Sequence, residues 1–387
     1  MPGETKTEMQ DPVQTRRLIR LSKSCLGEAE KQAVLEVLGR EYLGMGVEVQ
    51  QFEQALAGFF GRPAVCVVNG TAALQLAVQF CMGKPGDEVL VPSLTFVASF
   101  QAISAAGAKP VACEVDPLTG LLDLQDAEKR LTPRTRAVMP VHYSGGVGDL
   151  EAIYVFARRH GLRVIEDAAH AFGTTYQGRK VGGGGDVVCF SFDGIKNITS
   201  GEGGCVLADD PKLLRAIQDA RLLGVEKDTE QRYTGQRSWE FDVTAQGWRY
   251  HMSNVMAAIG LEQLKRFPSF AATRRNLARL YDSLLQGHPR VRPLPRDYGE
   301  VVPHIYVVRI AGLLDRKGLQ GRMLEHGIQT GVHYQPNHQL SLYRSADARP
   351  LPATDAVFPE LLTLPLHPDL SEDDVRHVCA KLSASLT

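Results

Sequence analysis

The sequence has no excess of charge of either sign. Its 387 residues include 43 Lys and Arg against 44 Asp and Glu, which leaves a formal net charge of −1. A chain that binds nucleic acid or an anionic membrane through its overall field needs a clear basic excess. We therefore expect neither partner, and any anion that binds must be held by a local site.

Long apolar runs are also missing. No uninterrupted apolar stretch approaches the roughly 20 residues that cross a bilayer. Residues 1–15 are polar, so no secretory signal is expected there. The seven cysteines are scattered, and no pair has the spacing of metal ligands or of a redox motif. These features favour a cytoplasmic protein with buried free thiols and no metal site.

Strand-like and helical patterns alternate through most of the chain. Helical periodicity appears at 28–38, 71–82, 97–106 and 150–160. Short apolar or β-branched runs, typical of strands, lie at 64–68, 88–91, 109–115, 136–141, 162–166, 187–192 and 205–208. This alternation predicts an α/β fold, with a largely parallel sheet covered by helices on both faces. Ligands of such sheets bind at the carboxyl ends of the strands.

The pattern changes after Ser253. A long helix is expected at 254–286, a strand at 304–310, a helix at 314–326 and a last helix from about Ser371, where Asp374 completes a capping box. A chain of 387 residues is also long enough for two domains. We therefore predict an N-terminal arm and large domain over 1–253, followed by a smaller α+β domain over 254–387.

Three segments carry residues suited to chemistry, each directly after an expected strand. In the first, Asn69 and Gly70 turn the chain into a helix that starts near Thr71. Exposed amides at a helix start, with a hydroxyl beside them, favour a phosphate group. A simple helix cap explains this segment equally well.

The second segment places Asp167 at the end of a buried strand. A buried carboxylate there is costly without a partner, and a protonated pyridine nitrogen is such a partner. The alternative role is a helix cap. Glu166 is the rival carboxylate, but strand alternation directs it to the opposite face of the sheet.

The third segment leaves the sheet at Ser191 and carries Lys196 before a glycine-rich turn at 201–204. A lysine on a solvated loop usually has no special role. Between two apolar strands, however, a desolvated amine loses its proton more readily and can attack an aldehyde. Ser191 is placed to offer a second hydroxyl to a phosphate.

These segments, in this order, resemble the DegT/StrS-type nucleotide-sugar aminotransferases, a family of fold-type I enzymes that use pyridoxal 5′-phosphate (PLP). The resemblance covers nearly the whole chain and includes the stretches 42–44, 69–74, 85–89, 140–142, 166–170, 185–186, 190–192, 196–197 and 201–204. It implies a large, mixed but mostly parallel sheet domain and a smaller C-terminal α+β domain. It also implies a homodimer with shared active sites.

The resemblance assigns roles to individual residues. Lys196 is expected to hold PLP as a Schiff base and then to move protons, and Asp167 to pair with the pyridine nitrogen. Phe96 is expected to stack on the ring and His170 to lie near its phenolic oxygen. The phosphate is expected to be held by Gly70, Thr71, Ala72 and Ser191.

The chain departs from the family pattern in residues 247–252. The family has an Asn there that reaches the cofactor phosphate of the other subunit, whereas this chain has Arg249 and His251. Either residue could serve the phosphate or the sugar nucleotide, or could be only a polar interface residue. Residues 333–338 resemble a stretch near the sugar, which makes His333, Tyr334 and His338 substrate candidates.

The implied activity is transfer of an amino group, with glutamate as the expected donor, to a keto group of a nucleotide-linked deoxysugar. The products would serve surface glycans or secondary metabolites. One alternative is a sugar dehydratase of the same fold, but those enzymes carry His where this chain has Lys196. A non-catalytic binding protein is another. A nicotinamide dehydrogenase is disfavoured, because the glycine run at 182–185 precedes a strand instead of following one.

Overall fold

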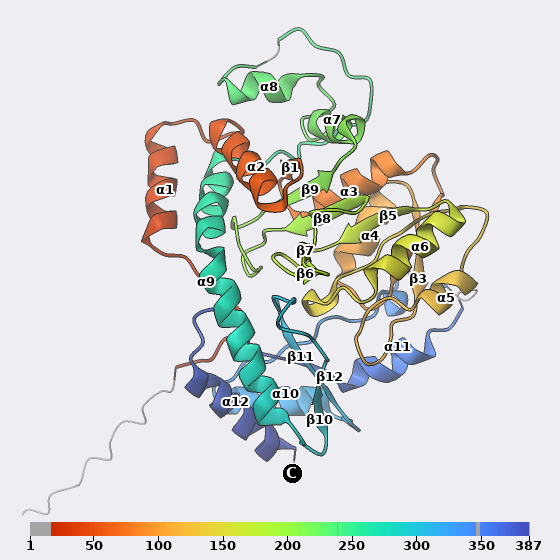
Figure 1. The fold of residues 1–387 in the computed structure, drawn as a ribbon, viewed down its shortest axis with the longest axis vertical. Coiled ribbons are helices and arrows are strands. Elements are labelled where there is room, and N and C mark those ends of the chain that lie inside the picture. The colour runs from red at the N-terminus through yellow and green to blue at the C-terminus, as the bar shows by residue number, and fades with distance from the viewer. Residues whose placement is uncertain (1–16, 238, 346–348, 387) are drawn as a thin grey trace, which may run out of the picture.

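A seven-stranded sheet forms the centre of the molecule (Figure 1). The structure, a computed structural model, describes residues 17–237, 239–345 and 349–386, so the polar stretch 1–15 lies outside it. The strand order is β1-β9-β8-β5-β4-β2-β3, and β9 runs antiparallel to both of its neighbours while the other pairs are parallel. The strands are β1 (Ala64–Val67), β2 (Glu88–Pro92), β3 (Lys109–Cys113), β4 (Thr135–Val138), β5 (Arg163–Asp167), β8 (Val187–Ser191) and β9 (Gly204–Ala208).

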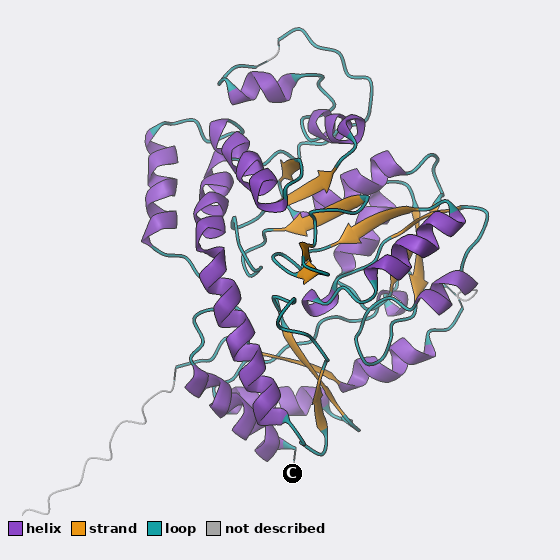
Figure 2. Cartoon of the chain, viewed as in Figure 1, coloured by secondary structure: helices purple, strands orange, loops and turns teal. Residues whose placement is uncertain are grey.

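Helices cover both faces of this sheet (Figure 2). Both faces are apolar, because successive side chains of a strand point to opposite faces of the sheet. On β8, Val187 and Cys189 belong to one apolar cluster, while Val188 and Phe190 belong to another. One face carries α3 (Gly70–Cys81), α4 (Val97–Ala105) and α7 (Pro211–Ala220). The other carries α2 (Val47–Phe60), α5 (Leu124–Lys129) and α6 (Leu150–His160).

A second, three-stranded antiparallel sheet follows in the C-terminal part. It consists of β10 (Val291–Pro293), β11 (Tyr306–Ile310) and β12 (Leu361–Leu364), and packs with α10 (Arg316–Glu325) and α12 (Glu372–Ser385). The remaining elements are α1 (Glu28–Gly39), α8 (Asp228–Tyr233), α11 (Pro352–Val357) and the short pair β6 (Thr175–Tyr176) and β7 (Arg179–Lys180). Across the described ranges, no helix combines the length and apolarity needed to cross a membrane.

The long helix α9 (Asn254–Leu285) joins the two parts. Near its start, Ala257 and Phe267 pack into a core of the large sheet, whereas Leu277 and Leu285 pack with the small one. The predicted domain boundary between residues 253 and 254 falls at the first residue of this shared helix, and it stays a prediction.

The expected elements are found with small shifts at their ends. The predicted α/β class, with helices on both faces of a mostly parallel sheet, is confirmed. The capping box is also present, because Ser371 Oγ accepts from the Asp374 amide at 3.1 Å and the Asp374 carboxylate accepts from the Ser371 amide at 3.0 Å. The expected strand at 304–310 starts two residues later, at Tyr306.

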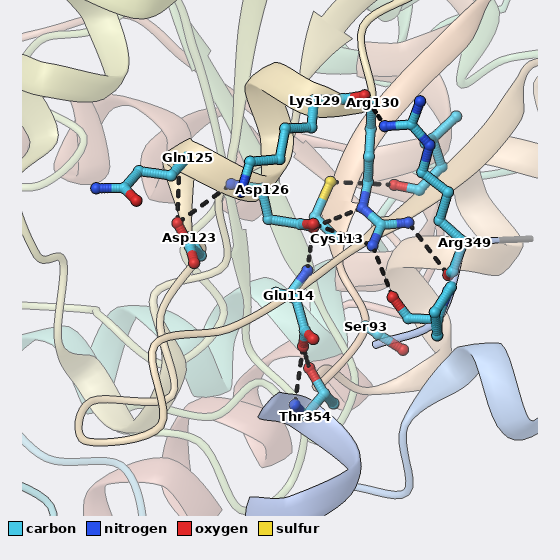
Figure 3. Close-up of polar contacts among 12 residues, drawn as sticks. Ser93, Cys113, Glu114, Asp123, Gln125, Asp126, Lys129, Arg130, Arg349 and Thr354 are labelled. Carbon is cyan, nitrogen blue, oxygen red and sulfur yellow. Dashed lines mark hydrogen bonds and ion pairs between the residues drawn. The ribbon is translucent and has the colours of Figure 1, made fainter. Parts of the chain in front are cut away.

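Polar contacts fasten residues 349–354 to the β3 side of the large sheet (Figure 3). Glu114, directly after β3, accepts from the amides of Ala353 and Thr354 at 2.9 and 2.8 Å. Arg130 pairs with Asp126 at 2.5 Å and donates to the carbonyls of Arg349 and Pro350 at 3.4 and 3.1 Å. These contacts tie the C-terminal part to the large sheet.

Candidate active site

A cavity of about 430 Å³ lies where β5 and β8 end and α3 begins. It brings together residues from segments far apart in the sequence, as expected for the carboxyl edge of a sheet with parallel neighbours. The sequence-predicted residues that line it are Gly70, Thr71, Phe96, Asp167, His170, Ser191, Lys196, His333 and Tyr334.

The start of α3 offers hydrogen-bond donors to an anion. Within the described ranges, the amides of Gly70 and Thr71 have no acceptor, because the first amides of a helix have no intrahelical partner. The Ala72 amide is already engaged, since it donates to the Asn69 side chain at 2.8 Å. The predicted phosphate role therefore fits Gly70 and Thr71 better than Ala72.

Ser191 lies directly against this helix start. A Cβ on Gly70 would lie 2.7 Å from the Ser191 Cβ, so the close approach requires glycine at position 70. The Ser191 hydroxyl oxygen accepts from the Asp193 amide at 3.3 Å, and its own proton has no acceptor in the described part of the chain. This hydroxyl and the two amides can hold a phosphate.

Asp167 is buried at the end of β5 and both of its oxygens are engaged. Ser99 Oγ donates to Oδ2 at 2.7 Å, and the Ala169 amide donates to Oδ1 at 3.2 Å. The carboxylate still has lone pairs for a donor inside the cavity. Its neighbour Glu166 points to the other face, as expected, where it contacts His142 at 2.8 Å and Tyr154 at 2.6 Å.

Lys196 presents a half-buried amine to the cavity. Burial lowers the pKa of this amine from 10.5 to about 8, and the negative charges of Asp193 and Asp167 oppose that fall. No hydrogen bond or ion pair to the described residues engages it. It is thus an amine that becomes nucleophilic close to neutral pH.

His170 and Tyr334 form a polar pair in the lining of the cavity. The Ser144 amide donates to His170 Nδ1 at 3.4 Å, so in the neutral ring the proton is on Nε2, which lies 3.1 Å from the Tyr334 hydroxyl. Burial holds the pKa of His170 well below its usual value and raises that of Tyr334. The Tyr334 hydroxyl accepts from His170 and keeps its proton available to the cavity.

Aromatic rings and a histidine also line the cavity. Phe96 is 53% exposed although large and apolar, and its ring lies 5.3 Å from that of Tyr334. His333 Nδ1 lies 2.9 Å from the Thr363 hydroxyl. Burial lowers the pKa of His333 to about 4, with a further contribution from Lys196, so the ring is neutral at pH 7.

Four predicted residues are not among those that line this cavity, and one of them, Ala72, is buried in the first turn of α3. Arg249 is exposed, and His251 pairs with Val67 along the edge of β1. His338 lines a separate cavity of about 700 Å³, where it contacts Ser93 at 2.7 Å and Asp355 at 3.0 Å.

Other residues of the site did not emerge from the sequence. Asp193 and Glu202 line the cavity, and Ser99 contacts Asp167 from helix α4. Burial, followed by the charge of Asp193, raises the pKa of Glu202. The sequence contained one indication of the role of Ser99. It follows Thr95 by four residues at the start of a helix, a spacing that brings two side chains together.

The residues of the cavity fit PLP. The lining includes anion donors at the start of α3, a buried carboxylate at the end of β5 and an amine with no partner among the described residues. Phe96 offers an exposed ring face for stacking. Each part of the cofactor therefore meets a group of matching chemistry.

Comparisons with known proteins agree. The profile of the DegT/DnrJ/EryC1/StrS aminotransferase family matches residues 24–383. The spore coat polysaccharide biosynthesis protein SpsC of Bacillus subtilis is 38% identical, over 91% of this chain and 93% of that protein. The dTDP-4-dehydro-2,3,6-trideoxy-D-glucose 4-aminotransferase of Saccharopolyspora spinosa is 37% identical, over 93% and 95%. The PLP form of Spr1654 from Streptococcus pneumoniae superposes with a TM-score of 0.88 at 29% identity, over 95% and 98%, and a PMP form is also known.

Proposed function

The chain belongs to the DegT/DnrJ/EryC1/StrS aminotransferase family, and on this basis we propose that it aminates a keto group of a nucleotide-linked deoxysugar, with L-glutamate as the donor. It is a PLP-dependent sugar aminotransferase. One observation carries the assignment of the site. The Lys196 amine, which has no partner among the described residues, shares a cavity with Asp167 and with the amides at the start of α3.

Each group of the cavity has a place in cofactor binding. Gly70, Thr71 and Ser191 would hold the phosphate, and Asp167 would accept a hydrogen bond from the protonated pyridine nitrogen and so keep the proton on the ring. The Lys196 amine would hold the cofactor through its aldehyde. When bound, PLP supplies an aldehyde that condenses with amines and a ring that withdraws electrons from the atom beside the amine nitrogen.

The side chains of this protein supply the proton transfers. A lysine amine with a pKa near 8 accepts and returns a proton close to neutral pH, which is what a general acid and base must do. The Tyr334 hydroxyl would donate a hydrogen bond to an oxygen of the bound substrate, because His170 occupies its acceptor side. The exposed ring of Phe96 would stack on the cofactor ring.

The relatives support the substrate class. SpsC is a protein of spore coat polysaccharide biosynthesis, and the Saccharopolyspora enzyme is a 4-aminotransferase of a dTDP-linked trideoxysugar. We infer a nucleotide-linked keto sugar here too, destined for a surface glycan or a secondary metabolite. The seven free cysteines support a reducing compartment, the cytoplasm.

The test is a panel of 3-keto and 4-keto nucleotide sugars, each incubated with the PLP-loaded protein and glutamate labelled with ¹⁵N. We expect the label in the amine of at least one sugar product, and none with the Lys196→Ala variant. If no sugar in the panel is aminated, while glutamate still converts the bound cofactor to its amine form, the proposed acceptor is wrong. If glutamate also fails, the activity itself is wrong.

We further propose a homodimer that shares its sites. The cavity is lined by three carboxylates (Asp167, Asp193 and Glu202) against the single amine of Lys196, although the ligands it accepts are anionic. A cation from a second copy of the chain would balance this charge. Arg249 is exposed and lies near β1, the edge strand that leads into the start of α3. The exposed leucines Leu35 and Leu38 on α1 also suit a subunit contact.

Mixing two inactive variants tests this sharing. Lys196→Ala removes the amine from a subunit's own site, whereas Arg249→Ala removes the cation that a subunit provides to the other site. In a hybrid dimer of the two variants, one site therefore has both residues intact. We expect the mixed and refolded variants to regain activity that neither has alone. Persistent inactivity of the mixture, or a monomer in sedimentation analysis, would contradict the shared site.

A further inference from the structure

Asp167 is held by a hydroxyl that the proposed chemistry does not use. Ser99, in the first turn of α4, donates to Asp167 Oδ2 at 2.7 Å. Ser99 is completely buried and is not among the residues that line the cavity. It contacts the cofactor-binding carboxylate from behind, where no ligand reaches it.

The Ser99 hydroxyl is itself held by Thr95. The two hydroxyl oxygens lie 3.0 Å apart. Because the only proton of Ser99 Oγ is directed at Asp167, the Ser99 oxygen accepts and Thr95 donates. The donors therefore run in one direction, from Thr95 through Ser99 to Asp167, and burial of all three excludes competing water.

A residue of the C-terminal part fixes the position of Thr95. Asn337 is fully buried, and its side-chain amide donates to the carbonyls of Thr95 at 2.8 Å and Ser93 at 3.1 Å. The Asn337 backbone amide adds a bond to the Ser93 carbonyl at 2.9 Å. The loop that carries Thr95 is thus held on both sides, by the sheet and by the segment that contains Tyr334.

We infer that Thr95 and Ser99 are positioning residues that direct the Asp167 carboxylate at the ring nitrogen of the cofactor. The inference rests on the proposed function. With Oδ2 held by Ser99 and Oδ1 by the Ala169 amide, the carboxylate cannot rotate freely, and its remaining lone pairs face the cavity. A ring N–H then meets an acceptor that is already in place, and no ordering is needed when the cofactor binds.

The test compares PLP with its analogue that carries C–H in place of the ring nitrogen. Equilibrium affinities of the apo-protein for both ligands are measured by calorimetry. Ser99→Ala should weaken PLP binding about tenfold, the effect of losing one hydrogen bond to a charged group, and leave binding of the analogue unchanged. Ser99→Thr keeps the hydroxyl and should restore PLP binding. A purely structural role would weaken both ligands equally.

Thr95→Val serves as a second variant, since it removes the hydroxyl that donates to Ser99 and leaves Ser99 in place. Thr95 also lines the cavity, and the analogue detects any direct loss of contact with the ligand. Thr95→Val should weaken PLP about threefold, again without effect on the analogue, and it decides the question if Ser99→Ala does not fold. Equal losses for both ligands, or no loss for either, would overturn the inference and leave the proposed function standing. Failure of the unmodified protein to bind PLP would overturn both.

Discussion

The rate at which the apo-protein captures PLP should rise with pH and level off above pH 8. Burial lowers the pKa of Lys196 from 10.5 to about 8, and only the neutral amine attacks an aldehyde. With that pKa, the neutral fraction is about one eleventh at pH 7 and about ten elevenths at pH 9, so the capture rate rises about tenfold over these two pH units. A lysine in open solvent would still gain about tenfold per pH unit at pH 9.

Stopped-flow absorbance of the lysine-bound cofactor measures this rate across the neutral and alkaline range. Asp193→Asn provides the matched perturbation, because the charge of Asp193 raises the pKa of Lys196 and its loss should move the midpoint to lower pH. Asp373→Asn, at an exposed position on α12, is the control and should leave the midpoint in place. A midpoint near 10.5 in the unmodified protein, or an upward shift in Asp193→Asn, would refute the reasoning.

Three further substitutions have defined outcomes. Gly70→Ala should weaken PLP binding at least about tenfold in equilibrium titrations, because the new Cβ would lie 2.7 Å from that of Ser191. The control is Gly58→Ala on α2, where a new Cβ meets nothing within 4 Å and should have no effect. Arg221→Leu leaves the buried Glu53 without its cationic partner and should lower the free energy of unfolding in urea by about 3–5 kcal/mol. Arg158→Leu, which breaks an exposed ion pair with Glu151, should lower the free energy of unfolding by less than about 1 kcal/mol. Equal losses of stability in the Arg221 and Arg158 variants would contradict this account. Tyr334→Phe should retain PLP affinity but lower kcat about tenfold, while Tyr343→Phe, outside the cavity, should leave kcat unchanged. Equal kcat values for the two variants would exclude Tyr334 as a hydrogen-bond donor to the substrate.

The main groups of the site could be predicted because each directly follows a strand. The start of α3 follows β1, Asp167 ends β5, and Ser191 ends β8. These three strands run in the same direction, because β9 lies antiparallel to both β1 and β8, so their carboxyl ends meet at one edge. Lys196 follows from the same logic, since its loop leaves the sheet at Ser191. The period of two along β5 also predicted that Asp167 and Glu166 face opposite sides.

Features that depend on contacts between distant segments could not be predicted. The position of β9 between β1 and β8 follows from pairing, which no local pattern encodes. His338 lies beyond the cavity because Asn337 anchors its segment to the loop after β2. Ser99 resembles any other serine in an apolar helix until the fold brings it to Asp167. Helix α2 was not among the predicted elements, although its buried residues Val49, Phe52, Leu56 and Phe60 recur at helical spacing.

The most direct test of the central claim is to reduce the PLP-loaded protein with borohydride, digest it and map the modified lysine by mass spectrometry. Reduction fixes the cofactor to the amine that holds it. The account predicts the added mass on the peptide that contains Lys196, and its loss in the Lys196→Ala variant. Labelling of another lysine, or covalent retention of PLP by Lys196→Ala, would contradict the account.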